Sequence, residues 1–169
     1  MSFRRAAGGG WGVIAVVQRV TEAQVVVEGR VVGRIAGGLV ALVAVHGTDT
    51  RDDVAWMAGK LAGLRIFRSG DKHFDVDVKQ AGGAVLLVSN FTVAAATRQG
   101  RRPSFDAAAP PEKGRELFDA LVEAVRGQGL AVETGVFGAD MAVSLVNHGP
   151  VTVIVDSTEG KKARMEIRE

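Results

Sequence analysis

The chain has 169 residues, no cysteine and a formal net charge of +2. This length suits one domain, and the shares of hydrophobic and charged residues, 47% and 24%, are those of an average globular protein, which excludes a disordered tail. The absence of cysteine excludes disulfide bonds, a thiolate nucleophile and Cys-ligated metal centres. No apolar run reaches the ~18 residues of a membrane span, so we expect a soluble, cytoplasmic protein without a membrane partner.

The sequence pI of about 9.3 suggests a nucleic-acid-binding protein, but the positive charge is unevenly distributed. Residues 1–12 contain two arginines and no acidic residue, whereas residues 13–158 contain fifteen basic and sixteen acidic residues. Attraction to phosphate must therefore come from local clusters of basic side chains. Composition also predicts three regions: a flexible, glycine-bearing leader (1–12), a single domain (13–157) and a polar tail (158–169).

The 27 valines of the chain favour strands over helices. β-branched runs broken by glycine in residues 13–46 predict three or four antiparallel strands. Gly29, between Glu28 and Arg30, suits a hairpin turn because glycine adopts positive φ without steric cost. Later apolar runs predict four more strands, at Ala84–Ser89, 131–137, 141–147 and 151–156.

Two helices are predicted from the spacing of apolar residues. The first lies within 49–67, where Val54, Met57, Leu61 and Leu64 recur at three- and four-residue intervals and Asp49 or Thr50 provides the cap. The second follows Pro110-Pro111 and ends near Gly127. A polar, glycine-bearing connection (69–83) is expected between the first helix and the strand that follows it.

These elements predict a mixed α/β fold. We expect about eight mostly antiparallel strands in two packed, barrel-like sheets, with two helices on one side, giving three layers. Two helices are too few to cover both faces of a large sheet.

The sequence predicts neither a metal site nor a cofactor. The three histidines, His46, His73 and His148, lie in separate segments without a spacing typical of metal ligands. The glycine-rich stretches lack the lysine, or the strand and helix, of a nucleotide-binding loop.

Three segments carry polar groups that a scaffold does not require, and each has an ordinary alternative. Ser89–Val93 places two hydroxyls and an amide at the end of an apolar strand, either as a cap or facing a ligand. Gly149-Pro150 is either an ordinary turn or a step that presents two carbonyls in an unusual direction. The arginines Arg98, Arg101 and Arg102 form either a solvated loop or a contact with an RNA backbone.

The chain resembles the D-aminoacyl-tRNA deacylase family, homodimeric enzymes that remove D-amino acids from tRNA, in six segments: AVVQRVTEAQVVVEG, VVGRI, LRIF, SNFTV, TRQGRRPSF and FGADMAVSLVNHGPVT. The first family motif, Ser-Gln-x-x-Leu, has Asn90 and Val93 as departures here. The second motif retains Asn147, Pro150 and Thr152, but His148 replaces the usual aspartate.

The resemblance implies how such a site would work. Gly149-Pro150 is expected to be cis and to enter the partner subunit's active site, where its carbonyl oxygens obstruct the side chain of an L-aminoacyl group. D-amino acids and glycine would then be accepted, because discrimination arises from a clash with the wrong substrate.

The resemblance also implies roles for the residues of the first motif and its surroundings. Backbone N–H groups near Phe91 and Thr92 would hold the substrate's carbonyl oxygen. Thr92 is one candidate nucleophile, but no obvious base activates it, so assistance by the 2′-hydroxyl of the terminal adenosine is favoured. Ser89 and Asn90 complete the predicted catalytic group, and Phe137, Met141 and Asn147 are expected to line the pocket and the adenosine site.

Two functions remain in competition. The first is an editing hydrolase that cleaves D-aminoacyl-tRNA and mischarged glycyl-tRNA. The second is a non-catalytic module that binds the acceptor end of tRNA, having lost activity through Asn90 and Val93.

Overall fold

The computed structural model describes residues 12–161. Within this range the elements occur in the order β1 (Ile14–Val27), β2 (Arg30–Ile35), β3 (Gly38–Ala44), α1 (Arg51–Gly63), β4 (Phe67–Ser69), β5 (Lys72–Val76), β6 (Ala84–Ser89), the short 3₁₀ helix η1 (Phe91–Ala94), α2 (Pro111–Gly127), β7 (Val132–Thr134) and β8 (Ala142–Asp156). Residues 158–161, after β8, are also helical. Six strands form one sheet in the order β2-β1-β3-β6-β7, with β8 also paired to β1, and β4 and β5 form a separate hairpin.

Strand β1 organises the sheet because its 14 residues pair with three other strands. Its first half pairs antiparallel with β3, its second half with β2, and both halves pair with β8. Glu28 and Gly29, with φ values of 49° and 75°, form the turn to β2, which confirms the predicted hairpin. The pairs β3–β6 and β6–β7 are parallel.

The sheet curls until its two outer strands, β2 and β7, nearly meet. A Cβ atom built on Gly33 of β2 would lie 2.3 Å from the carbonyl oxygen of Thr134 in β7. Only glycine permits this approach of two backbones, because any side chain at position 33 would collide with the carbonyl. The strands therefore form a nearly closed barrel.

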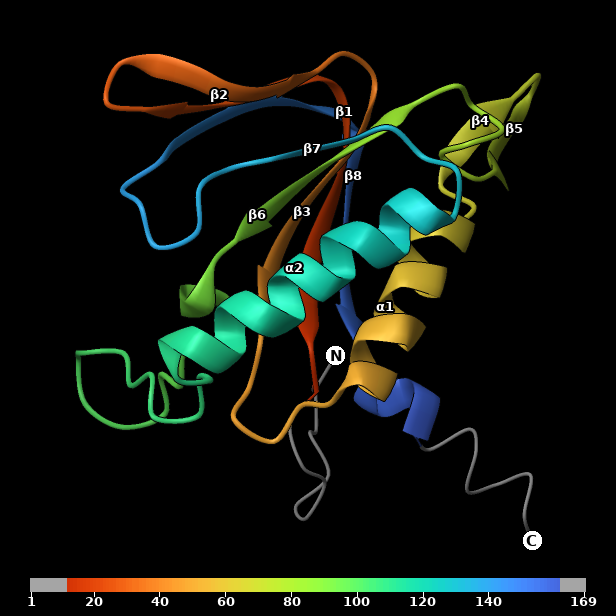
Figure 1. Cartoon of the computed structure of the whole chain (residues 1–169). Helices are drawn as coiled ribbons and strands as arrows, with labels where there is room; N and C mark the ends of the chain where they lie inside the picture. The colour runs from red at the N-terminus through yellow and green to blue at the C-terminus, as the bar shows by residue number, and fades with distance from the viewer. Residues whose placement is uncertain (1–11, 162–169) are drawn as a thin grey trace, which may run out of the picture.

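Both faces of the central strands are buried: one packs against the helices, and the other packs inside the barrel. Leu39, Ala41 and Val43 of β3 pack in the larger core with side chains of α1 and α2. Val40 points to the opposite face, where it packs with other side chains of the barrel interior, among them Leu86. Both helices cover one face of the sheet (Figure 1). The predicted mixed α/β fold, with barrel-like strands and two helices on one side, is confirmed.

A buried cluster of hydrogen-bonded polar side chains stabilises the start of α1. Thr50 is the N-cap, one of the two predicted caps, and its backbone N–H donates to Asp53 at 2.9 Å. Asp49 instead accepts a hydrogen bond from the His46 N–H at 2.7 Å. Asp53 also accepts from the Ser157 hydroxyl at 2.8 Å and pairs with Lys161 at 2.8 Å. The cluster therefore joins α1 to the end of the described chain.

The pKa values of the two aspartates in this cluster are shifted in opposite directions. Burial raises the pKa of Asp49 to about 6 despite the hydrogen bond from His46. Burial acts in the same direction on Asp53, but hydrogen bonds from Lys161, Thr50 and Ser157 outweigh it and lower the pKa of Asp53.

Two expectations about the strands were wrong. The runs 141–147 and 151–156 are not separate strands but parts of β8, because β8 pairs with β1 on both sides of Gly149-Pro150. The connection 69–83 contains part of the β4–β5 hairpin, whose short, charged strands lack an apolar pattern. The predicted leader and tail lie largely outside the described residues, which include Gly12 and the helical residues 158–161.

Candidate active site

The first predicted motif lies where β6 ends and η1 begins. Ser89 is the last residue of β6, and the Asn90 N–H donates to the Val43 carbonyl at 2.8 Å, which continues the parallel pairing with β3. The hydroxyl of exposed Thr92 donates to Oδ1 of Asn90. In residues 12–161, no histidine or carboxylate forms a hydrogen bond with Thr92, so the structure supplies no base for a threonine nucleophile.

The backbone N–H groups of Phe91 and Thr92 begin η1. The first N–H groups of a helix have no acceptor within it, and the bond that closes this turn comes from the Val93 N–H to the Asn90 carbonyl at 3.2 Å. The hydrogen bonds that close η1 therefore leave the N–H groups of Phe91 and Thr92 unused.

The arginine loop adjoins this motif. Reciprocal backbone hydrogen bonds between Ala96 and Ser104, at 2.8 and 2.9 Å, close the loop that carries Arg98, Arg101 and Arg102. Next to its base, the Phe105 ring packs edge-on against the Phe91 ring at 5.1 Å between centroids. All three arginines are exposed, and none forms an ion pair within the described part of the chain. The loop can therefore present positive charge beside Phe91.

Two of the three residues predicted to line the pocket, Phe137 and Met141, lie on opposite faces of the sheet. Phe137 packs on the helix side, with Phe118 at 6.3 Å between ring centroids and the Arg115 guanidinium 4.7 Å from its ring. Met141 packs against the barrel interior. The segment that carries both begins beside β6, because the Gly135 N–H donates to the Leu87 carbonyl at 3.3 Å.

The second motif forms a bulge in β8. Thr152 pairs with Gln18 and Asn147 with Val20, so residues 148–151 lie opposite Arg19 alone. Gly149-Pro150, within this bulge, has a cis peptide bond. The Asn147 amide closes the bulge by donating to the carbonyls of Arg19 at 3.1 Å and Val151 at 2.9 Å.

Arg19 supports this bulge, although sequence reasoning did not select it. Its side chain is 4% exposed. Nε donates to the His148 carbonyl at 3.2 Å and Nη1 to the Ile66 carbonyl at 2.7 Å. Burial, and then the charge of Arg68, lowers the pKa of Arg19. The signal in the sequence was a charged residue within the apolar run of a predicted strand.

The two motifs do not meet within one chain. Arg19 pairs with Leu39, which pairs with Val85, whereas Ser89 pairs with Val43. The Gly149-Pro150 bulge is therefore about 13 Å from Ser89 along the strand direction alone, at ~3.3 Å per residue. Strands β1 and β3 also separate β8 from β6. A site that used both motifs would need a second chain.

Within residues 12–161, no group of three or more His, Asp or Glu side chains is placed to hold a metal ion. Of the histidines, His46 is buried with Nδ1 2.7 Å from the Gly12 carbonyl oxygen, while His73 and His148 are exposed. The helices of this part of the chain are too short or too polar to cross a membrane.

Comparison with known proteins identifies the family. A model of the family described as D-Tyr-tRNA(Tyr) deacylase matches residues 16–156. The chain belongs to this family. The D-aminoacyl-tRNA deacylase of Desulfitobacterium hafniense strain DCB-2 is 54% identical over 143 residues, covering 85% of this chain and 96% of the relative. The corresponding protein of Thermotoga petrophila is 51% identical over 145 residues, covering 86% and 97%.

Solved structures of similar proteins show the same fold. A c-Myc DNA unwinding element binding protein superimposes with a TM-score of 0.79 at 34% identity, covering 84% of this chain and 97% of that one. A probable eukaryotic D-amino acid tRNA deacylase has a TM-score of 0.75 at 16% identity and covers 85% and 98%, a likeness of fold alone.

Proposed function

We propose that this protein hydrolyses the ester bond of D-aminoacyl-tRNA and of mischarged glycyl-tRNA in the cytoplasm, releasing the free amino acid and tRNA. The observation that carries the proposal is the family match over residues 16–156, which includes both motifs with Thr92, Gly149 and Pro150 retained. L-aminoacyl-tRNA is left intact.

The proposed active site is shared between two copies of the chain. Its support is the separation of Ser89 from Gly149-Pro150 within one chain. A partner's Gly-Pro step would reach the first motif, and its carbonyl oxygens would obstruct an L side chain. Sedimentation of the purified protein would then give a dimer, whereas a monomer under assay conditions contradicts the shared site.

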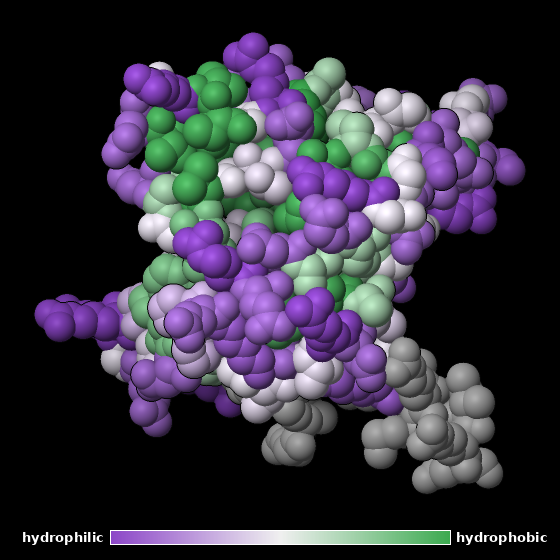
Figure 2. Space-filling model, in the orientation of Figure 1, coloured by the Kyte–Doolittle hydropathy of each residue, from purple (hydrophilic) through white to green (hydrophobic). Residues whose placement is uncertain are grey.

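Exposed apolar side chains give the dimer further support. Figure 2 shows apolar surface over the end of the molecule that β2 occupies in Figure 1. Exposed valines of β2, of the segment that leads into β8 and of the start of β8 are Val31, Val32, Val136 and Val143, which are 36% to 50% exposed. Contiguous apolar surface of this kind marks interaction sites.

In the proposed reaction, the protein supplies position and hydrogen-bond donors. A water oxygen adds to the ester carbonyl carbon, the bond to the ribose oxygen breaks, and that oxygen leaves with a proton. The N–H groups of Phe91 and Thr92 stabilise the oxyanion. Because no histidine or carboxylate of residues 12–161 forms a hydrogen bond with Thr92, the 2′-hydroxyl of the terminal adenosine assists the attack in its place.

The arginine loop is proposed to hold the acceptor end of the tRNA. Arg98, Arg101 and Arg102 are exposed beside Phe105, whose ring contacts Phe91. Guanidinium groups pair well with phosphates. Asn147 also contributes by holding the Gly-Pro bulge in shape.

The deciding experiment compares D-tyrosyl-tRNA with L-tyrosyl-tRNA in the presence of the purified protein. We expect the D ester to disappear rapidly and the L ester to decay at the rate measured without protein. A D ester as long-lived as in the control would overturn the proposal.

Thr92→Ala separates the two mechanisms. If the RNA hydroxyl assists the attack, the single-turnover rate of the variant should stay close to that of the wild-type protein. A loss of several orders of magnitude would assign the chemistry to Thr92, and Ser69→Ala, which removes an exposed hydroxyl on β4, is the control. For the alternative of a non-catalytic module, Asn90→Gln should restore hydrolysis to a protein that otherwise only binds.

A further inference from the structure

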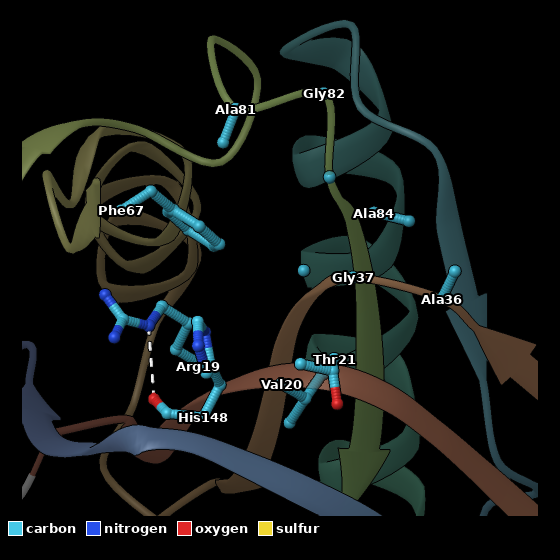
Figure 3. A pocket seen from close by; sticks show the side chains of 12 residues that line it. Arg19, Val20, Thr21, Ala36, Gly37, Phe67, Ala81, Gly82, Ala84 and His148 are labelled. Atoms are coloured by element: carbon cyan, nitrogen blue, oxygen red, sulfur yellow. Dashed lines mark hydrogen bonds between the residues drawn. The ribbon is translucent and has the colours of Figure 1, made fainter. Parts of the chain in front are cut away.

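A cavity of about 430 Å³ lies next to the Gly149-Pro150 bulge, and the proposed reaction does not use it. Residues of five segments line it: Arg19 to Thr21 of β1, the turn at 36–38, the turn at 81–84, Phe67 of β4 and His148 of β8. Phe67, Arg19 and His148 lie on one side of the cavity, and Gly37 and Ala84 lie on the other (Figure 3).

The lining carries basic groups and no acidic side chain. Arg19 contributes a guanidinium and His148 an imidazole, and Arg68 adds positive potential at Arg19. Neither Arg19 nor His148 forms an ion pair with a carboxylate within residues 12–161. A buried charge without a counter-ion is costly, so an anion in the cavity would be stabilised.

Arg19 has a donor group to spare. Nε and Nη1 donate to the carbonyls of His148 and Ile66, whereas Nη2, which lies beside Gly149 of the bulge, donates no hydrogen bond to any described residue. The two carbonyls also hold the guanidinium in place. A donor fixed in this way binds an oxyanion without a further loss of side-chain freedom.

The opposite wall is backbone, which leaves the cavity open. A Cβ on Gly38 would lie 1.9 Å from the Ala84 carbonyl oxygen, and one on Gly83 would lie 3.0 Å from Cα of Gly38. These glycines let β3 and β6 start side by side, and no side chain larger than that of alanine enters from either turn.

We infer that this cavity binds a phosphate group, held by Arg19 and His148. The residue at position 148 makes the site a property of this chain, because the aspartate usual in the family motif would place a carboxylate beside Arg19 and neutralise it. The phosphate comes either from the RNA backbone or from free phosphate in solution, and the binding chemistry is the same for both.

The first experiment titrates the protein with inorganic phosphate and follows backbone amide shifts by NMR. We expect saturable shifts at Gly37, Gly82 and His148, with a Kd of order 1 mM, about −4 kcal/mol. His148→Asp should weaken binding at least tenfold. His73→Asp makes the same change at an exposed histidine outside the cavity and should leave the affinity unaltered.

The inference is overturned if the shifts do not saturate, if they fall only on the loop of Arg98, Arg101 and Arg102, or if His148→Asp binds phosphate as well as His73→Asp does. Retained folding of both variants is established by their dispersed amide spectra. Because the readout is binding, a protein that lacks deacylase activity could still confirm the site, and an active deacylase could still refute it.

The second experiment identifies the source of the phosphate. A short RNA hairpin with a single-stranded 3′ end is compared with the same RNA carrying methylphosphonate linkages, which are uncharged, in that end. If the unmodified RNA shifts the cavity amides with a lower Kd than inorganic phosphate does, and the methylphosphonate RNA does not, the site binds the RNA backbone. If both RNAs bind equally weakly while inorganic phosphate gives saturable shifts, the site binds free phosphate.

Discussion

Gly149 occupies a backbone conformation that other residues avoid, with φ of 125°. A Cβ atom there would also lie 2.9 Å from Nη2 of Arg19 and 2.9 Å from Cγ2 of Val151. Single residues at this bulge therefore determine whether the Gly-Pro step keeps its shape, since the surrounding contacts leave no room for adjustment.

We predict that Gly149→Ala lowers the rate of D-tyrosyl-tRNA hydrolysis at least tenfold and destabilises the fold by about 1–3 kcal/mol. Steady-state kinetics and urea unfolding measure the two effects. Gly47→Ala is the matched control, because no heavy atom lies within 4 Å of a Cβ built there. Hydrolysis by the Gly149→Ala variant at the wild-type rate would contradict the proposed role of the bulge.

At the scale of elements, the start of α1 makes stability depend on pH. Folding raises the pKa of Asp49 to about 6, so the folded state binds this proton more tightly than the unfolded chain does. The unfolding free energy contributed by Asp49 is therefore fully present below about pH 4 and falls as pH rises to about 6. Above about pH 6, the unfolding free energy lost through Asp49 no longer changes with pH.

Asp49→Asn should remove this loss while keeping an oxygen for the His46 N–H. We expect the variant and the wild type to be equally stable near pH 4, and the variant to be more stable at pH 7 by as much as about 3 kcal/mol. Urea unfolding across this pH range measures the difference. Asp52→Asn, at an exposed neighbour, should show no such divergence, and equal stabilities of Asp49→Asn and wild type at pH 7 would refute the prediction.

The sequence predicted most elements, and two of its failures have a common physical origin. Apolar periodicity located α1 and α2, and glycine with β-branched residues located β1 to β3. Gly149-Pro150 was interpreted as a break between strands because local signals cannot show that β1 pairs with both sides of the bulge. The role of Arg19 was missed for the same reason, since its carbonyl partners, at His148 and Ile66, are distant in sequence.

At the scale of the whole molecule, the near balance of charge in residues 13–158 limits the electrostatic contribution to RNA binding. If three loop arginines supply the phosphate contacts, the logarithm of the binding constant should fall with the logarithm of salt concentration with a slope of about −2 for a single strand. Binding of an acceptor-end RNA at several salt concentrations measures this slope. A slope steeper than about −5 would mean that a wider surface takes part.

In the proposed dimer, the separation of Ser89 from the Gly149-Pro150 bulge would make each chain contribute one motif to each of two sites. Two inactive proteins could therefore complement each other. Mixing Gly149→Ala subunits with subunits in which a bulky replacement at Ser89 blocks the first motif would create hybrid dimers. In such a dimer one site collects both defects and the other is intact, so activity lost in each parent should return in the mixture.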